Sequence, residues 1–252
     1  MLFKIPKRDD SLFHFGEAAH KHHGAEHLNL LVWNIYKGKM GPQWREDFRG
    51  LAADKDLIFV QEALFPEHKE FFESQMPGWH WSFAPSFQYR FSLRSTGVVM
   101  GSRIHPHSFD FHRHSEKEFL VGTPKMTLHH RYLLGESHTF SVVNTHSVNF
   151  TSHQNYFSQW QSVEKFFHLE KSGPLIVAGD FNTWNTTRWL YLLNFLGQHG
   201  LEPVILDDDP RVLKLDHVFF RHCTVEKASI RKEIRSSDHW PMEVRLRLTD
   251  RL

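Results

Sequence analysis

Short, strongly apolar runs recur along the chain, and segments with a helical spacing of apolar residues separate them. Each run has the length of a strand, contains β-branched or aromatic side chains and is bounded by polar residues or by Gly-Pro, which predicts a buried strand. The predicted buried strands cover residues 28–34, 56–62, 97–100, 140–146, 175–178 and 215–220. Residues 126–134 and 242–248 instead alternate between polar and apolar side chains, as antiparallel strands do.

Helices are predicted between these strands. They cover residues 44–53, 66–76 and 187–198, and a further helix begins near Thr151. Thr151-x-x-Gln154 is a capping-box pattern, and apolar residues follow it at spacings of three and four as far as Phe167. This stripe predicts a helix that packs on the core rather than a cofactor site.

The order of the predicted elements indicates one domain. We expect it to cover residues 28–252, preceded by a flexible N-terminal arm over residues 1–27. The arm lacks periodicity and is rich in histidine, for which a metal-binding tract is the alternative interpretation. Hairpin-like neighbours and strand–helix–strand passages both occur in the domain. This mixture predicts an α/β fold in which two mixed β-sheets face each other and helices cover the outer faces.

Composition limits the class of protein. The 252 residues are 40% hydrophobic and carry a formal net charge of +1, which gives no strong attraction to nucleic acid or anionic membranes. No apolar run approaches the roughly 20 residues that cross a bilayer, and the first ten residues lack the apolar segment of a secretory signal. We therefore expect no integral membrane segment and a cytoplasmic location. The single cysteine, Cys223, fits a reducing compartment and a packed thiol. The oligomeric state stays open.

Candidate chemistry gathers at the ends of the predicted strands. The polar residues there are Asn34, Glu62, His146, Asp180, Asn182 and Asp216, and a further loop carries Asp238 and His239. Singly, such residues are typical turn formers. Together they form a set of carboxylates, amides and histidines without a thiol, which suits Mg²⁺ or Mn²⁺ better than structural zinc. Such a set supports the attack of water on a phosphoryl centre.

The ordered motifs resemble the endonuclease/exonuclease/phosphatase superfamily of DNase I-like proteins. They are Trp33-Asn34, Gln61-Glu62, Asn144-Thr145-His146, Gly179-Asp180-Phe181-Asn182, Leu215-Asp216-His217 and Ser237-Asp238-His239-Trp240-Pro241. The resemblance covers about residues 28–248 and is strongest to a subgroup of uncharacterised bacterial members. It implies a four-layer α/β-β/α sandwich of two mixed β-sheets.

The resemblance also implies a metal site. Glu62 resembles the principal Mg²⁺ ligand of the superfamily, and Asn34 resembles the amide beside it that helps to hold metal and water. Asp238 would complete this site. Magnesium is the expected cofactor, and manganese is the alternative.

The same resemblance assigns five residues to catalysis. Asp180 resembles the carboxylate that orients or deprotonates the attacking water, and Asn182 the amide that steadies the phosphate. His239 would contact the scissile phosphate or act as a base, with Asp216 fixing its tautomer. His146 matches a histidine that binds phosphate or protonates the leaving group in the DNase-like and sphingomyelinase-like branches.

Substrate contacts are expected from loops near residues 38–45, 79–95, 103–125 and 183–188. The candidates are Arg94, Lys125 and Trp240, with Arg90, Arg188, Trp79, Trp81 and Trp184 as further positions. Basic side chains there would contact phosphate, and aromatic ones would stack on bases or touch an acyl chain.

The expected function is a metal-dependent phosphoric ester hydrolase, first of all a nuclease-type phosphodiesterase. The alternative is a phospholipid or inositol-phosphate hydrolase, which the same residues would serve. A non-catalytic scaffold with this fold is the third hypothesis, and it would be marked by the loss of site residues. None of the mapped positions is lost.

Overall fold

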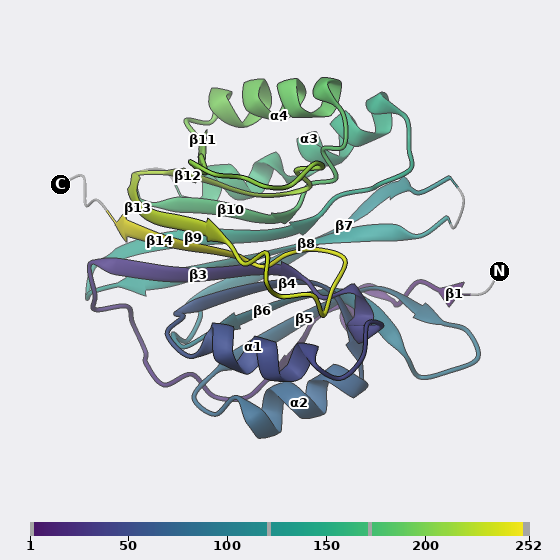
Figure 1. Ribbon diagram of the computed structural model, residues 1–252, viewed down its shortest axis with the longest axis horizontal. Helices are drawn as coiled ribbons and strands as arrows, with labels where there is room; N and C mark the ends of the chain where they lie inside the picture. Colours follow the sequence, from purple (N-terminus) through teal and green to yellow (C-terminus); the bar gives the residue numbers. More distant parts are fainter. Residues whose placement is uncertain (1–2, 120–121, 171–172, 249–252) are drawn as a thin grey trace.

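Two β-sheets face each other, and a pair of helices covers the outer face of each (Figure 1). The computed structural model describes residues 3–119, 122–170 and 173–248. Within these residues, the layers run from α3 (His153–Leu169) and α4 (Thr186–Gln198), through the two sheets, to α1 (Trp44–Ala52) and α2 (Glu67–Gln75) (Figure 1). The predicted four-layer sandwich is thereby confirmed.

The first sheet joins strands from both ends of the chain. Its order is β1 (Phe3–Lys4), β5 (His80–Tyr89), β6 (Ser95–Ser102), β4 (Leu57–Phe65), β3 (His27–Asn34), β14 (Met242–Leu248) and β13 (Cys223–Ile230), and β2 (Phe13–Phe15) also pairs with β5. The second sheet is formed within residues 108–221. Its order is β11 (Glu202–Pro203), β12 (Asp216–Arg221), β10 (Leu175–Asp180), β9 (His138–His146), β8 (Pro124–Leu134) and β7 (Ser108–Lys117).

Central strands are apolar on both faces because both faces are covered. In β3, Leu30 and Val32 point into the core between the sheets, whereas Leu31 and Trp33 pack against α1 and α2. This double burial explains the unbroken apolar runs in the sequence. Burial of apolar side chains at about 25 cal/mol per Å² supplies the main force that holds the layers together.

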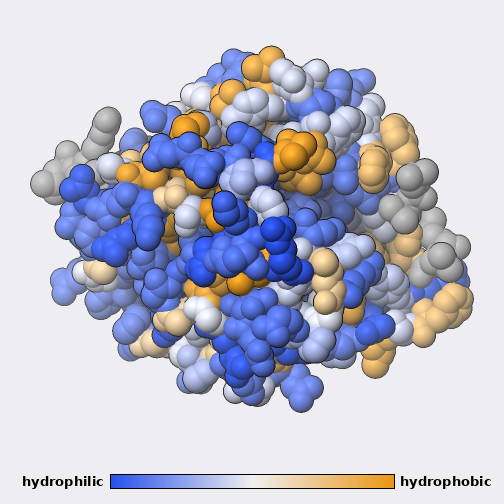
Figure 2. All heavy atoms as spheres, in the orientation of Figure 1, coloured by the Kyte–Doolittle hydropathy of each residue, from blue (hydrophilic) through white to orange (hydrophobic). Residues whose placement is uncertain are grey.

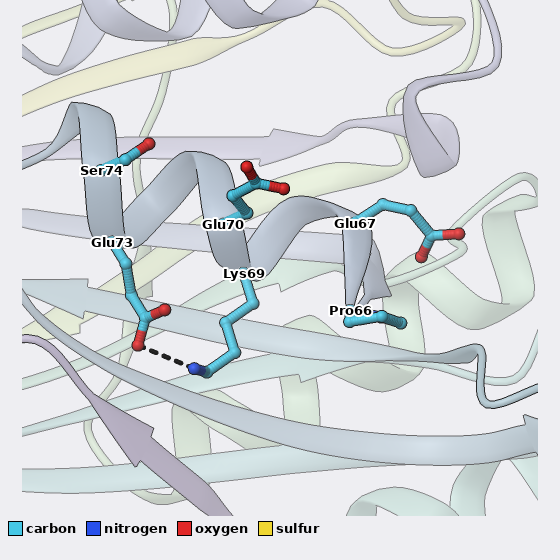
Figure 3. Close-up of a pocket in the computed structure, with 6 residues that line it drawn as sticks. All are labelled: Pro66, Glu67, Lys69, Glu70, Glu73 and Ser74. Carbon is cyan, nitrogen blue, oxygen red and sulfur yellow. Dashed lines mark hydrogen bonds and ion pairs between the residues drawn. The ribbon is translucent and has the colours of Figure 1, made fainter.

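The helices follow the predicted ranges closely. The helix expected to begin near Thr151 begins at His153, and Ser152 rather than Thr151 is its N-cap, because the Ser152 hydroxyl accepts a hydrogen bond from the backbone amide of Asn155. The outer face of α2 is charged, and an ion pair of 2.8 Å joins Lys69 to Glu73 there (Figure 3).

Two segments differ from the expectation. Residues 79–95, expected as a substrate loop, contain the whole of strand β5, and the N-terminal arm that was expected to be flexible contributes β1 and β2, both paired with β5. Strand β13 was not predicted. Among the described residues, no helix combines the length and the apolar character needed to cross a membrane.

Buried histidines make the fold sensitive to acid. Burial lowers the pKa of His80 and of His129 to about 4, and it holds the pKa values of His114 and His130 well below the usual range. Below pH of about 6.5 the unfolded chain takes up protons that the folded chain cannot bind. Stability should therefore be complete above that pH and should fall down to pH of about 4.

We expect the melting temperature to be at least about 10 °C lower at pH 5 than at pH 7.5, since each unit of pKa shift corresponds to about 1.4 kcal/mol. Calorimetry across this range tests the expectation. His129→Gln should flatten the slope, whereas His168→Gln, at an exposed position on α3, should leave it unchanged. A pH-independent melting temperature would contradict this account.

Candidate active site

Strand register places three of the expected site residues side by side. In the parallel pair β9/β10, His146 lies opposite Asp180, and in the antiparallel pair β10/β12, Asp180 lies opposite Asp216. The first sheet ends likewise, with Asn34 of β3 opposite Gln61 of β4. Both sheets thus present polar strand ends to the same cleft.

Gly179 makes the close approach of β9 and β10 possible. Its φ is 138°, and a Cβ atom there would lie 2.0 Å from the carbonyl oxygen of Thr145. Only glycine fits this position without moving the neighbouring strand. Asp180 is therefore held beside His146, with 3.4 Å between its Oδ2 and the Nε2 of the histidine.

Glu62 is aimed by a β-bulge. The register of β4 against β6 shifts between Val60 and Ala63, and Glu62 has a φ of 57°. A bulge re-directs a side chain that regular pairing would place elsewhere, and a positive φ in a non-glycine residue is maintained only when the surroundings enforce it. As a result the Glu62 carboxylate reaches the cleft, where it contacts the ammonium of Lys37.

His239 and Asp216 form an oriented pair. The Nδ1 atom of His239 lies 2.8 Å from Oδ2 of Asp216, which leaves Nε2 facing Asp180, with 4.0 Å to its Oδ2. Burial lowers the pKa of His239, but the carboxylates of Asp216 and Asp180 outweigh it and raise the pKa to about 10. Burial opposes ionisation of Asp216, yet the imidazolium holds the pKa of Asp216 below its usual value.

Asp180 and His146 are both shielded from water. Burial raises the pKa of Asp180 to about 7, even though its Oδ2 accepts a 3.0 Å hydrogen bond from the Asn34 amide. Burial, followed by the positive charge of Lys125, holds the pKa of His146 well below its usual range, so this imidazole is neutral. The Nζ atom of Lys125 lies 3.3 Å from Nε2 of His146.

Backbone contacts fix the two loops that complete the cleft. The amide nitrogen of Asn182 donates to Oδ1 of Asp180 at 3.0 Å, and its side-chain amide donates to the carbonyl of Ser147 at 2.8 Å. The Ser237 hydroxyl donates to the carbonyl of Asn34 at 2.6 Å, beside Asp238. These bonds join the loop after β10 to one sheet and the loop before β14 to the other.

The cleft has a volume of about 710 Å³ and brings together most of the predicted site residues. Those that line it are Asn34, Glu62, Lys125, His146, Asp180, Asn182, Asp238 and His239, while Asp216 lies behind His239. Arg94 and Trp240 are not among the lining residues. Arg94 pairs with Glu67, and the ring of Trp240 lies under the guanidinium of Arg235.

Arg188 was expected among the phosphate contacts, and that prediction is wrong. Its side chain is buried and donates to the carbonyls of Val148, Asn182 and Asn149, so it fixes the loops behind the site. Trp79 and Trp81 are likewise buried in the core under α1 and α2. The prediction that Trp79 and Trp81 contact substrate is therefore wrong, because both side chains are buried.

Sequence reasoning singled out Lys125 but named no other lysine and no tyrosine of the cleft, although it expected substrate contacts from residues 38–45 and 79–95. Tyr36, Lys37, Lys39 and Tyr89 line it, although none occupies a recognised motif position. It also assigned no role to Gln61 and Asn144, which are buried and joined across the two sheets by a 2.7 Å hydrogen bond. Their positions in the motifs could have identified them, because Gln61 directly precedes Glu62 and Asn144 lies two residues before His146.

The residues around Glu62 fit a divalent cation. Glu62 and Asp238 present two carboxylates, and burial together with the charge of Glu62 raises the pKa of Asp238. A cation between them would relieve this repulsion, and the Lys37 ammonium on Glu62 already shows that positive charge is favoured there. The donors are all oxygen atoms when the Asn34 amide is included, which suits Mg²⁺ or Mn²⁺.

The layered fold, with a carboxylate- and histidine-lined cleft at the strand ends, defines a DNase I-like α/β sandwich. A model of the endonuclease/exonuclease/phosphatase family matches residues 31–239. The chain belongs to this family, which includes metal-dependent phosphoesterases. The resemblance drawn from the sequence motifs is confirmed.

Relatives and solved structures agree with this placement. A UPF0294 protein of Vibrio cholerae is 36% identical over 228 residues, which cover 88% of this chain and 78% of that protein. An endonuclease/exonuclease/phosphatase protein of Beutenbergia cavernae superposes with a TM-score of 0.70 at 16% identity, covering 89% of this chain and 72% of the other. A mannosyl-6-phosphatase of Bacteroides thetaiotaomicron gives 0.68 at 16% identity and covers 87% and 99%. These structural likenesses establish the fold.

Proposed function

We propose that the protein is a Mg²⁺-dependent phosphodiesterase that directs water at a phosphodiester held in the cleft. The observation that carries this proposal is the row of His146, Asp180 and Asp216 across three paired strands, with Glu62 facing it from the other sheet. In-line hydrolysis requires acid–base residues on one side of the phosphate and carboxylates that can hold a metal on the other.

Glu62, Asn34 and Asp238 would hold the metal. When bound, Mg²⁺ or Mn²⁺ neutralises the charge that develops on the leaving oxygen. Asp180 is in position to take a proton from the attacking water, because its raised pKa makes it a stronger base than an exposed aspartate. Its orientation is fixed by the Asn182 backbone amide.

The cationic side of the site would bind the phosphoryl oxygens. His239 is protonated and points Nε2 into the cleft, and Lys125 adds a second positive charge. Neutral His146 offers a hydrogen bond rather than a charge, which favours the phosphate-binding role over protonation of the leaving group. Preorganised charges of this kind act strongly where water is excluded.

A substrate panel tests the proposal. The purified protein is incubated with bis(p-nitrophenyl) phosphate, plasmid DNA, RNA, sphingomyelin and inositol phosphates, each with Mg²⁺, Mn²⁺ or EDTA. We expect hydrolysis of a phosphodiester that EDTA abolishes, and a melting temperature that rises with Mg²⁺. Saturation at about 100 times the Kd should add about 2.7 kcal/mol to the stability of the folded state.

Absence of both effects would favour the non-catalytic scaffold. A metal-dependent shift without hydrolysis of any diester, but with release of phosphate from a monoester, would instead assign phosphatase activity. The cytoplasmic location and the domain boundary at residue 28 stay predictions from the sequence.

A further inference from the structure

Four large apolar side chains are exposed in segments that contain the cleft-lining residues Tyr89, Glu118 and Phe150. Phe91 and Leu93, in the turn between β5 and β6, are 86% and 85% exposed, and Phe119, after β7, is 72% exposed. Phe150, after β9, is 55% exposed. We call these four residues the apolar rim. Figure 2 shows separate patches of apolar side chains along the right-hand edge of the molecule, on the side where Figure 1 places the β5–β6 connection.

The rim is held in place by backbone hydrogen bonds. The amide of Tyr89 donates to the carbonyl of Arg94 at 2.8 Å and closes the turn that carries Phe91 and Leu93. The amide of Phe119 donates to the carbonyl of Phe150 at 2.8 Å. The main chain that carries these exposed side chains is therefore hydrogen-bonded at Tyr89 and at Phe119. Exposed apolar clusters of this kind mark interaction surfaces.

The rim continues into an apolar wall of the cleft. Phe3 and Phe87 pack with ring centroids 5.3 Å apart, and Phe87 and Tyr89 are also 5.3 Å apart. These three residues and Phe150 line the cleft that ends at Asp180 and His239. A substrate with a phosphate at the polar floor of this space would have room for apolar groups beside Phe3, Phe87 and Phe150.

Positive charges lie beside the rim. Arg90 and Lys117 are exposed next to Phe91 and near Phe119, and Lys39 lines the cleft. Apolar tips flanked by lysine and arginine suit the surface of an anionic bilayer, where the tips enter the interface and the cations meet phosphate groups. A nucleic-acid surface would instead require a row of basic residues along a groove. The net charge of +1 favours neither surface, so the choice rests on the local combination of exposed apolar and basic side chains.

We propose that the apolar rim inserts into the surface of an anionic phospholipid bilayer and presents a lipid headgroup phosphodiester to the cleft. The catalytic part of this inference rests on the proposed function, whereas the binding part does not. The substrate class would then be a phospholipid in a membrane rather than a polynucleotide.

Vesicle flotation in EDTA tests the binding part without catalysis. The probes are vesicles of phosphatidylcholine with phosphatidylglycerol and vesicles of phosphatidylcholine alone. We expect the protein to float with the anionic vesicles, and Phe91→Ser/Leu93→Ser to reduce the bound fraction by about tenfold or more, since interfacial binding scales with inserted apolar area. Leu190→Ser/Ile205→Ser, which removes exposed apolar side chains from other elements, should bind like the parent protein.

Hydrolysis of soluble bis(p-nitrophenyl) phosphate separates this inference from the proposed function. Phe91→Ser/Leu93→Ser should retain this activity while losing activity on vesicle-bound phospholipid. If the parent protein hydrolyses the soluble diester but does not float with vesicles, the membrane inference is overturned and the proposed function survives. If it floats but hydrolyses nothing, the proposed function fails alone. Rim-dependent binding to an oligonucleotide, without vesicle binding, would assign the rim to nucleic acid instead.

Discussion

Glu62→Gln is expected to lower kcat/KM for bis(p-nitrophenyl) phosphate by roughly 10²- to 10³-fold, the range for loss of a preorganised electrostatic group. The substitution preserves size and one acceptor oxygen but removes one of the two carboxylates, Glu62 and Asp238, that face the proposed cation position. Lys37, which pairs with Glu62, would then face a neutral amide. The loss should be smallest at high Mg²⁺ concentration, because a weaker site is filled by mass action.

The melting temperature gives an independent measurement for the same variant. Mg²⁺ should raise the melting temperature of the parent protein and should shift that of Glu62→Gln much less at equal concentration. Glu73→Gln is the matched control, because Glu73 lies on the outer face of α2 and pairs with Lys69 (Figure 3). If Glu62→Gln had unchanged activity and Mg²⁺ raised its melting temperature as much as that of the parent protein, Glu62 would not be a metal ligand.

His239→Gln is expected to reduce kcat by about 10²- to 10⁴-fold, as for a group that transfers protons or stabilises charge in the transition state. Glutamine can still reach Asp216, but it carries no positive charge towards the phosphoryl oxygens. Asp216→Asn should have a smaller effect, because the imidazole stays and only its orientation and charge are weakened. The measurement is the initial rate at saturating Mg²⁺ and substrate.

Folding must be checked for these variants, because the backbone carbonyl of His239 accepts a 3.0 Å hydrogen bond from the indole of Trp33. His239 contributes only its main-chain carbonyl to that bond. Glutamine should therefore preserve the bond, and the melting temperature should change little. His168→Gln provides the exposed histidine control. Normal turnover by His239→Gln would show that residues other than His239 stabilise the phosphoryl group.

The sequence predicted most of the polar residues that line the cleft because apolar strands end abruptly on them. The runs before Asn34 and Asp180 show where each strand stops, and the strand ends of a mixed sheet converge. The register between strands, however, is set by which strands pair with each other. That His146, Asp180 and Asp216 lie abreast depends on which strands are neighbours, which no local pattern specifies.

Strand β5 and the contact between Lys37 and Glu62 could not be predicted for a different reason. Strand β5 contains His80, Ser82 and Pro85, so its composition resembles a loop, although tertiary contacts bury the first two and a register shift accommodates the proline. The contact of Lys37 with Glu62 joins residues 25 positions apart on different elements. Such contacts exist only after the sheets are packed, and propensity carries no information about them.

The hydrogen bonds from Trp33 and Ser237 connect positions more than 200 residues apart, so the cleft can be completed only after residues 237–239 have been synthesised. Asn34 and Glu62 are synthesised before the second sheet, and the whole second sheet is synthesised before Asp238 and His239. Strand β14, which then joins β3 to β13, is the last to be inserted into the first sheet. A chain cut short before residue 237 therefore lacks Asp238 and His239 of the cleft, and it also lacks strand β14, without which β13 is not joined to β3.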